Sequence, residues 1–124
     1  MTEQTRLNRV VIDFLAKGKT EEQWLVVLVE EVNAEFDLDG FLYDFQDRLY
    51  NCLDAIIDGQ LADKFPDTLN KNIVIRVDCY QIPRQEVEEF FVSFTTGVLD
   101  LQDYAEGLAN SIYVKDITFE INFD

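Results

Sequence analysis

The stretch NIVIRVDCY, residues 72–80, alternates apolar and mixed side chains over its whole length. Ile73, Ile75, Val77 and Cys79 share one face of a strand, because successive side chains of a strand point to opposite faces of the sheet. Charged and polar side chains interrupt the other face. A strand with one apolar face predicts a small sheet with helices packed mainly on that one side.

Two further segments have strand character. DITFEINFD, residues 116–124, repeats the alternation, with Ile117, Phe119, Ile121 and Phe123 on the apolar face. QWLVVLVEE, residues 23–31, is apolar on both faces, which is typical of a central strand. A short hairpin strand at 34–38 is an alternative for the connection that follows it.

Helical periodicity fills the intervals between these strands. It predicts a first helix over 4–17 that ends before Gly18, and a long helix over 40–58. Pro83 suits the first turn of a third helix, and Asp100 suits the N-cap of a short fourth one. We therefore expect an α+β fold in the order αβαβααβ, with a sheet of three to four strands in a single two-layer domain, 1–124.

Composition places the chain among globular proteins that carry their own apolar core. It has 124 residues, of which 48% are hydrophobic and sixteen are aromatic. Cys52 and Cys79 fall at positions expected to be buried, and the longest apolar run, WLVVLV, is too short to cross a bilayer. No N-terminal stretch has the pattern of a signal peptide. We expect a reduced, cytoplasmic protein.

The net charge of −15 is unusual and unevenly distributed. Residues 1–19 carry a net charge of +2, so the remaining chain carries −17. Such a surface repels nucleic acid and anionic membranes and attracts basic proteins, which predicts a basic protein partner and no direct nucleic-acid or membrane binding. The alternative is that the acidity serves only solubility.

Residues with catalytic chemistry are scarce. The chain has no histidine, and Ser93 and Ser111 are its only serines, neither of them in a nucleophile pattern. The five glycines form no phosphate-binding loop. We expect no enzyme activity, no catalytic residues and no cofactor, although a hydrolase that uses only carboxylates stays an alternative.

The acidic stretch EFDLDGFLYDFQD, 35–47, has some features of a calcium-binding loop. Placing Gly40 at the sixth loop position puts acids at the first, third and fifth positions, but Gln46 then stands where a bidentate glutamate is needed. Starting at Asp37 instead puts Arg48 at that position. Neither register satisfies calcium, so we expect no metal site.

The helix predicted over 40–58 carries a file of acidic side chains, which we call the acidic face. Its members are spaced three, four, three and four residues apart and fall within an arc of roughly 80° opposite the apolar stripe, along about 21 Å. Arg48 is the one base nearby, and Tyr43 and Tyr50 lie along one edge. The acidic face consists of Asp44, Asp47, Asn51, Asp54 and Asp58.

The connection before this helix is acidic as well, and its acids favour the positive N-terminal end of the helix dipole. It carries Glu30, Glu31, Glu35, Asp37 and Asp39. We predict that the two parts form one partner-binding surface. The predicted binding residues are Glu35, Asp37, Asp39, Tyr43, Asp44, Asp47, Tyr50, Asn51, Asp54 and Asp58.

The helix YDFQDRLYNCLDAIID and the approach EEVNAEFDLD give the chain a resemblance to bacterial immunity proteins, which neutralise a nuclease toxin delivered by a competitor. The resemblance is one of type: small, acidic, α+β and without catalytic residues. It implies a role in bacterial competition and a tight one-to-one complex with a basic toxin domain. Two alternatives stay open: a phage-type nucleic-acid mimic that inhibits a DNA-binding or defence protein, and a ligand-binding domain that uses Arg76, Tyr80 and Glu120.

Overall fold

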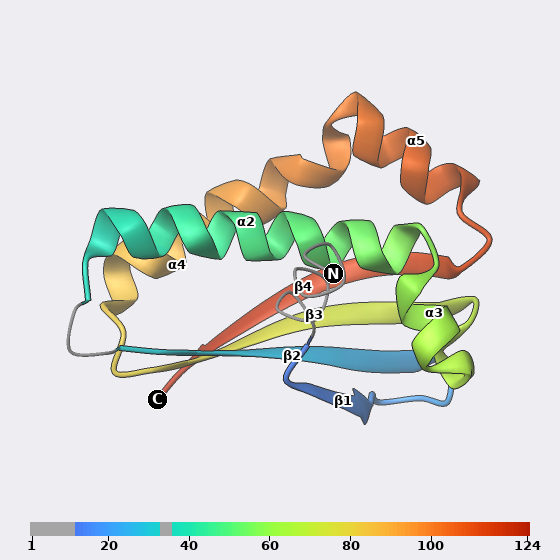
Figure 1. The fold of residues 1–124 in the computed structure, drawn as a ribbon, viewed down its shortest axis with the longest axis horizontal. Coiled ribbons are helices and arrows are strands. Elements are labelled where there is room, and N and C mark those ends of the chain that lie inside the picture. The colour runs from blue at the N-terminus through green and yellow to red at the C-terminus, as the bar shows by residue number, and fades with distance from the viewer. Residues whose placement is uncertain (1–11, 33–35) are drawn as a thin grey trace, which may run out of the picture.

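The computed structural model describes residues 12–32 and 36–124, which form a four-stranded sheet in the order β1-β2-β3-β4 (Figure 1). β1 pairs antiparallel with β2, whereas β2, β3 and β4 are parallel. The parallel strands need long crossovers, and the helices supply them. The strands are β1 (Phe14–Lys17), β2 (Gln23–Glu31), β3 (Lys71–Tyr80) and β4 (Val114–Phe123).

The long helices lie on one face of this sheet, so the described residues form a two-layer α+β domain, as predicted (Figure 1). The prediction of helices on one face and a small sheet is confirmed. Short 3₁₀ turns occupy Pro66–Thr68 and Val98–Asp100. The helices are α2 (Leu38–Ile57), α3 (Gln60–Lys64), α4 (Arg84–Gly97) and α5 (Gln102–Asn110).

The core lies between β3 and α2. Ile75 and Val77 on β3 are fully buried, and so are Leu49 and Leu53 on the apolar stripe of α2. Each such side chain contributes roughly 1.5–3 kcal/mol relative to exposure, so this contact fixes α2 against the sheet. Because its apolar stripe faces the sheet, the opposite side of α2 is directed to solvent.

The helix predicted over 4–17 is wrong at its C-terminal end, where residues 14–17 form β1. Leu15 and Lys17 pair with Val26 and Trp24 of β2, and the Gly18 N–H donates to the Gln23 carbonyl at 2.7 Å to close the hairpin. The free edge of β2 offers backbone partners to this segment, and that pairing overrides the local helical period. Residues 4–11 of the predicted helix lie outside the described part of the chain.

Two further boundaries differ from prediction. Leu38 is helical rather than part of a strand at 34–38, because the Asp37 carboxylate accepts the Gly40 N–H at 2.9 Å and starts α2 there. Residues 34 and 35 lie outside the described residues. Asp100 is not the N-cap of α5: it ends a 3₁₀ turn, and Leu101 takes the cap position.

Candidate partner-binding surface

The acidic face of α2 is directed to solvent, as the sequence predicts. Asp44, Asp47, Asp54 and Asp58 are exposed, and Asn51 is half-buried. Among the described residues, none of these four carboxylates forms an ion pair with a lysine or arginine. The face therefore presents four negative charges that this part of the chain leaves uncompensated.

Three of the four carboxylates accept hydrogen bonds from neutral groups. Asp54 accepts the Tyr104 hydroxyl at 2.8 Å, and Asp58 accepts the Gln60 side-chain amide at 2.9 Å. The Asn51 amide reaches Asp47 at 3.5 Å, which is a weak contact. These bonds orient the side chains without neutralising their charge, so the negative field along α2 persists.

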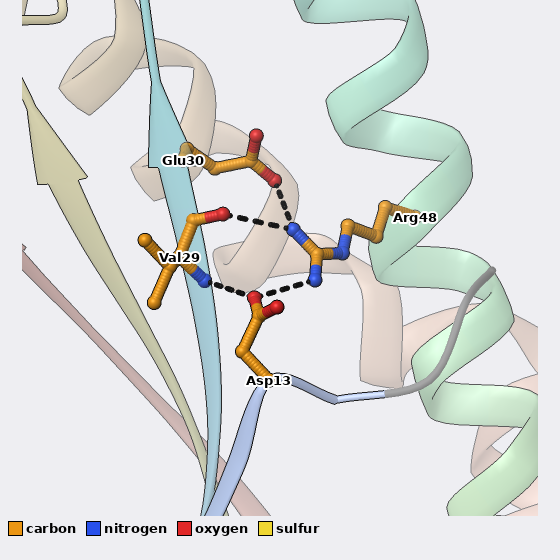
Figure 2. A network of polar contacts seen from close by, with 4 residues as sticks. All are labelled: Asp13, Val29, Glu30 and Arg48. Atoms are coloured by element: carbon orange, nitrogen blue, oxygen red, sulfur yellow. Dashed lines mark hydrogen bonds and ion pairs between the residues drawn. The ribbon is translucent and has the colours of Figure 1, made fainter. Parts of the chain in front are cut away.

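Arg48, the one basic residue of α2, points toward the end of β2 (Figure 2). Its guanidinium donates to Glu30 at 2.7 Å, to Asp13 at 2.8 Å and to the Val29 carbonyl at 3.1 Å. Asp13 also accepts the Val29 N–H at 2.7 Å. The β1–β2 ladder ends at the Phe14–Val27 pair, so Asp13 and Arg48 satisfy backbone groups of β2 that have no strand partner there.

Burial and the bonds of the Arg48 guanidinium shift the pKa values of this network in opposite directions. The side chains of Arg48 and Glu30 are only 19% and 16% exposed. Burial alone would lower the pKa of Arg48, but its hydrogen bonds to Asp13 and Glu30 outweigh burial and raise it. Burial raises the pKa of Glu30 above its usual value of 4.5, although Arg48 opposes this shift. The positive charge of Arg48 is thus paired with Asp13 and Glu30 within the fold.

The two predicted aromatic anchors differ in position. The Tyr43 side chain is 74% exposed near the start of α2 and is free to pack against a partner. Tyr50 is half-buried, with its ring centroid 5.0 Å from that of Phe94 and 5.7 Å from that of Tyr104. Tyr50 therefore holds α4 and α5 against α2, and only Tyr43 remains as an exposed anchor.

The acidic approach to α2 is partly used by the fold itself. Asp37 caps the helix and stays exposed, and Asp39 is exposed in the first turn. Glu31 is exposed at the end of β2, whereas Glu30 is bound by Arg48. Glu35 lies outside the described residues. The exposed part of the approach extends the acidic face at its N-terminal end.

The calcium-loop alternative fails on geometry. A loop with Gly40 at its sixth position would run to Gln46, yet α2 is already helical from Leu38 onward. Within 12–32 and 36–124, no group of three or more acidic, cysteine or histidine side chains is arranged to hold a metal ion. The acids around Gly40 serve as the N-terminal cap of a helix.

A shallow groove of about 390 Å³ opens between the C-terminal half of α2 and α5. Asp54 and Asp58 from the acidic face reach it, and Asp103 on α5 adds a third carboxylate. Burial, together with the hydrogen bond to Asp54, raises the pKa of the Tyr104 hydroxyl. A negative groove of this kind suits a cationic side chain. The groove is lined by Asp54, Ile57, Asp58, Asp103, Tyr104 and Gly107.

Sequence reasoning missed the contribution of α5 to this surface. The helical period places Tyr104 on the inward side of α5, but nothing in the sequence indicates that α5 docks on α2. That docking brings together side chains fifty residues apart, as the Tyr104–Asp54 hydrogen bond shows. Asp103 is carried into the groove by the same contact.

The cysteines are not suited to nucleophilic chemistry. Both are buried and free, and burial raises the pKa of Cys52 and of Cys79 to about 12. Because the thiolate is the reactive form, both side chains are unreactive thiols at neutral pH. Their position on the core faces of α2 and β3 fits a packing role.

The alternative ligand site on the sheet does not assemble as a set. Arg76 donates to Asp78 on its own strand at 3.0 and 3.1 Å, and Asp78 also accepts from Asn122. Glu120 lies beside Arg76 in the register of β3 and β4 but is not its ion-pair partner. Arg76 is therefore occupied by a neighbour on its own sheet face.

Comparison of the chain with protein-family models, with curated proteins and with solved structures finds no match. Within the described residues, no helix combines the length and the apolar character needed to cross a membrane.

Proposed function

We propose that this chain is a protein-binding module of the immunity type, which binds and neutralises a basic, nuclease-type toxin through the acidic face of α2. One observation carries the proposal: Asp44, Asp47, Asp54 and Asp58 lie exposed along one helix without cationic partners among the described residues. A surface that binds nucleic acid is rich in lysine and arginine, and carboxylates can occupy the positions of phosphates on it.

The energetics favour a cationic partner over a passive solvated face. Acids spaced three and four residues apart on one helix repel each other by a few tenths of a kcal/mol per pair. Arg48 cannot relieve this repulsion because it is held by Glu30 and Asp13. A basic partner would relieve it and form charge-assisted hydrogen bonds, while Tyr43 supplies an aromatic contact near the start of the helix.

The groove between α2 and α5 supports the same proposal at the other end of the acidic face. Ile57 and Gly107 give it an apolar component, and Asp54, Asp58 and Asp103 give it charge. An arginine from the partner could place its aliphatic stem on the apolar part and its guanidinium among the carboxylates. The toxin would thus be contacted along the whole helix.

The proposal is tested by capturing partners from a lysate of the source organism on the immobilised chain, at low and at high salt. We expect one basic protein that is released as salt rises, shows nuclease activity by itself, and loses that activity when the free chain is added. Capture of a protein without nuclease activity, or a nuclease that stays active in the complex, would exclude the immunity role.

A nucleic-acid mimic is the second candidate, because the regular file of uncompensated acids on α2 also resembles a phosphate backbone in charge. Competition separates the two. A mimic would bind several unrelated DNA-binding proteins, and excess duplex DNA would displace it from each. An immunity protein would bind one target and ignore the others.

A further inference from the structure

Within the part of the chain that the structure describes, β4 forms one edge of the sheet, and its outward backbone groups have no strand partner. β4 follows β3 in the strand order, and no described strand follows β4. The Asp124 N–H donates to the Cys79 carbonyl at 2.9 Å, so even-numbered residues of β4 direct their backbone groups toward β3. The backbone groups of Phe119, Ile121 and Phe123 therefore point away from the sheet.

Side-chain burial shows that this edge is open on the helix side as well. Ile75, Val77 and Cys79 on β3 are fully buried, and their register partners on β4 are Phe119, Ile121 and Phe123. All three of those partners are only half-buried, although they face the same helix layer. The apolar layer thus continues to the edge of the sheet, where, among the described residues, Phe91 and Arg84 of α4 cover Phe119 and Phe123 only in part.

The opposite edge of the sheet is protected, which makes the β4 edge distinctive. β1 has four residues only, and beyond it Asp13 and Arg48 bond the free backbone groups of Val29. β4 has ten residues and no proline. Among residues 12–32 and 36–124, one side chain accepts from its outward N–H groups: Asp116 accepts the N–H of Ile117 at 2.9 Å. Long unprotected edge strands pair with other strands.

We propose that β4 pairs antiparallel with β4 of a second copy of this chain, around a two-fold axis at Phe119, which joins the two sheets into one. In this register Ile117 lies opposite Ile121 and Thr118 lies opposite Glu120. Asp116 lies opposite Asn122. No two like charges face each other between residues 116 and 122, so the pairing is electrostatically permitted.

Neighbouring registers are disfavoured by charge. A shift by two residues in one direction places Asp116 opposite Glu120, and a shift in the other direction places Glu120 opposite itself and Asp116 opposite Asp124. A shift by one residue would place a residue whose backbone groups point toward the partner opposite one whose backbone groups point toward β3, so the two could not form hydrogen bonds. The register centred on Phe119 is therefore favoured over its nearest neighbours. The two-fold axis keeps both helix layers on the same side, which leaves both acidic faces accessible.

The repulsion between two chains of charge −15 opposes this association, and salt weakens the repulsion. Dimerisation should thus strengthen as salt rises, whereas binding of a basic partner at the acidic face should weaken. The opposite salt dependences keep the two proposals separable, and neither depends on the other.

Light scattering of the full chain across a range of salt concentrations tests the proposal. We expect the mass to rise toward twice the 14.4 kDa of one chain. Residue 118 of each copy lies opposite Glu120 of the other, so a substitution there acts twice in the dimer. Thr118→Glu should weaken association about fivefold, and Thr118→Lys should strengthen it about fivefold. Thr96→Glu and Thr96→Lys make the same charge changes at an exposed position of α4 and should have little effect.

Hydrogen exchange locates the contact without any substitution. The amides of Phe119, Ile121 and Phe123 should be protected in the dimer and exchange fast on dilution to monomer. Those of Thr118, Glu120 and Asn122, which bond β3, should stay protected in both states. The proposal would be overturned if the chain stays monomeric up to about 1 mM. It would also be overturned if a dimer forms but the amides of Phe119, Ile121 and Phe123 exchange fast in it, or if these amides become protected only when a different protein is added.

Discussion

Arg48 links three segments of the chain through one guanidinium group. It joins α2 to the end of β2 and to Asp13 at the start of β1, and two of its three bonds go to carboxylates (Figure 2). Its removal would leave the buried Glu30 carboxylate and the Val29 carbonyl without their donor. Because Arg48 bonds to these groups, it forms no ion pair with the carboxylates of the acidic face of α2.

Replacing Arg48 by methionine should lower the free energy of unfolding by about 1–3 kcal/mol, because buried acceptors lose their donor while the apolar stem is kept. Urea denaturation measures the change. Arg84→Met is the matched control: Arg84 pairs with Glu88 on α4, but both side chains are well exposed, at 67% and 41%. That substitution should cost less than about 1 kcal/mol. Equal losses of unfolding free energy in the Arg48→Met and Arg84→Met variants would contradict the role given to Arg48.

Glu30 should make stability fall as pH rises. Burial raises its pKa above 4.5, so the folded chain holds this proton more tightly than the unfolded chain. Its stabilising contribution is therefore complete below the unfolded pKa and is lost as pH rises through the folded pKa. The stability of the wild type relative to Glu30→Gln should decrease as the pH rises above 4.5. A relative stability that increases over this range would show that Arg48 lowers the pKa instead.

At the scale of elements, the turn after α2 determines where the helix layer ends. Gly59 separates α2 from α3 and has a φ of 99°, a conformation that residues with a Cβ atom rarely adopt. A Cβ atom placed there would lie 2.9 Å from carbons of the Tyr113 ring. The turn therefore requires glycine for its backbone and for the close approach of the ring.

Gly59→Ala should lower the free energy of unfolding by about 1–3 kcal/mol because of this strained backbone and the contact with Tyr113. Gly97→Ala is the control. Gly97 has a right-handed φ of −111° and no atom within 4 Å of an added Cβ, so alanine there should be neutral or stabilise by about 0.4–1 kcal/mol. Thermal denaturation of both variants measures these changes. A Gly59→Ala variant as stable as the wild type would show that the turn does not require glycine.

The sequence predicted those elements whose side chains repeat with a clear period. The alternation of β3 and the stripe of α2 come from burial on one face, which local sequence records directly. Residues 14–17 were mispredicted because their strand forms by pairing with the edge of β2, and the side-chain period of these residues does not record that pairing. The groove on α5 was missed for the same reason, since Tyr104 and Asp54 meet only through tertiary packing.

At the scale of the whole molecule, charge opposes compactness. A net charge of −15 on 124 residues favours expanded states through self-repulsion, and α2 concentrates part of that charge on one face. Salt screens this repulsion, with a Debye length that shrinks from about 30 Å at 0.01 M to about 3 Å at 1 M. Stability should accordingly depend on ionic strength.

The melting temperature should therefore rise with sodium chloride between these concentrations. Asp44→Lys with Asp47→Lys changes the net charge from −15 to −11 and should reduce the rise, since it also breaks the like-charge file on α2. Glu86→Lys with Glu89→Lys makes the same change of charge on exposed positions of α4 and should reduce the rise less. A melting temperature independent of salt would mean that the acids do not repel each other appreciably.

The same two double variants test the acidic face most directly when their affinity for the captured partner is measured by titration calorimetry across salt concentrations. We predict that Asp44→Lys with Asp47→Lys weakens binding by well over tenfold at low salt and flattens the salt dependence. Glu86→Lys with Glu89→Lys should stay within a few-fold of the wild type. Equal affinities for the wild type and the α2 variant, or equal losses in both variants, would contradict binding through α2.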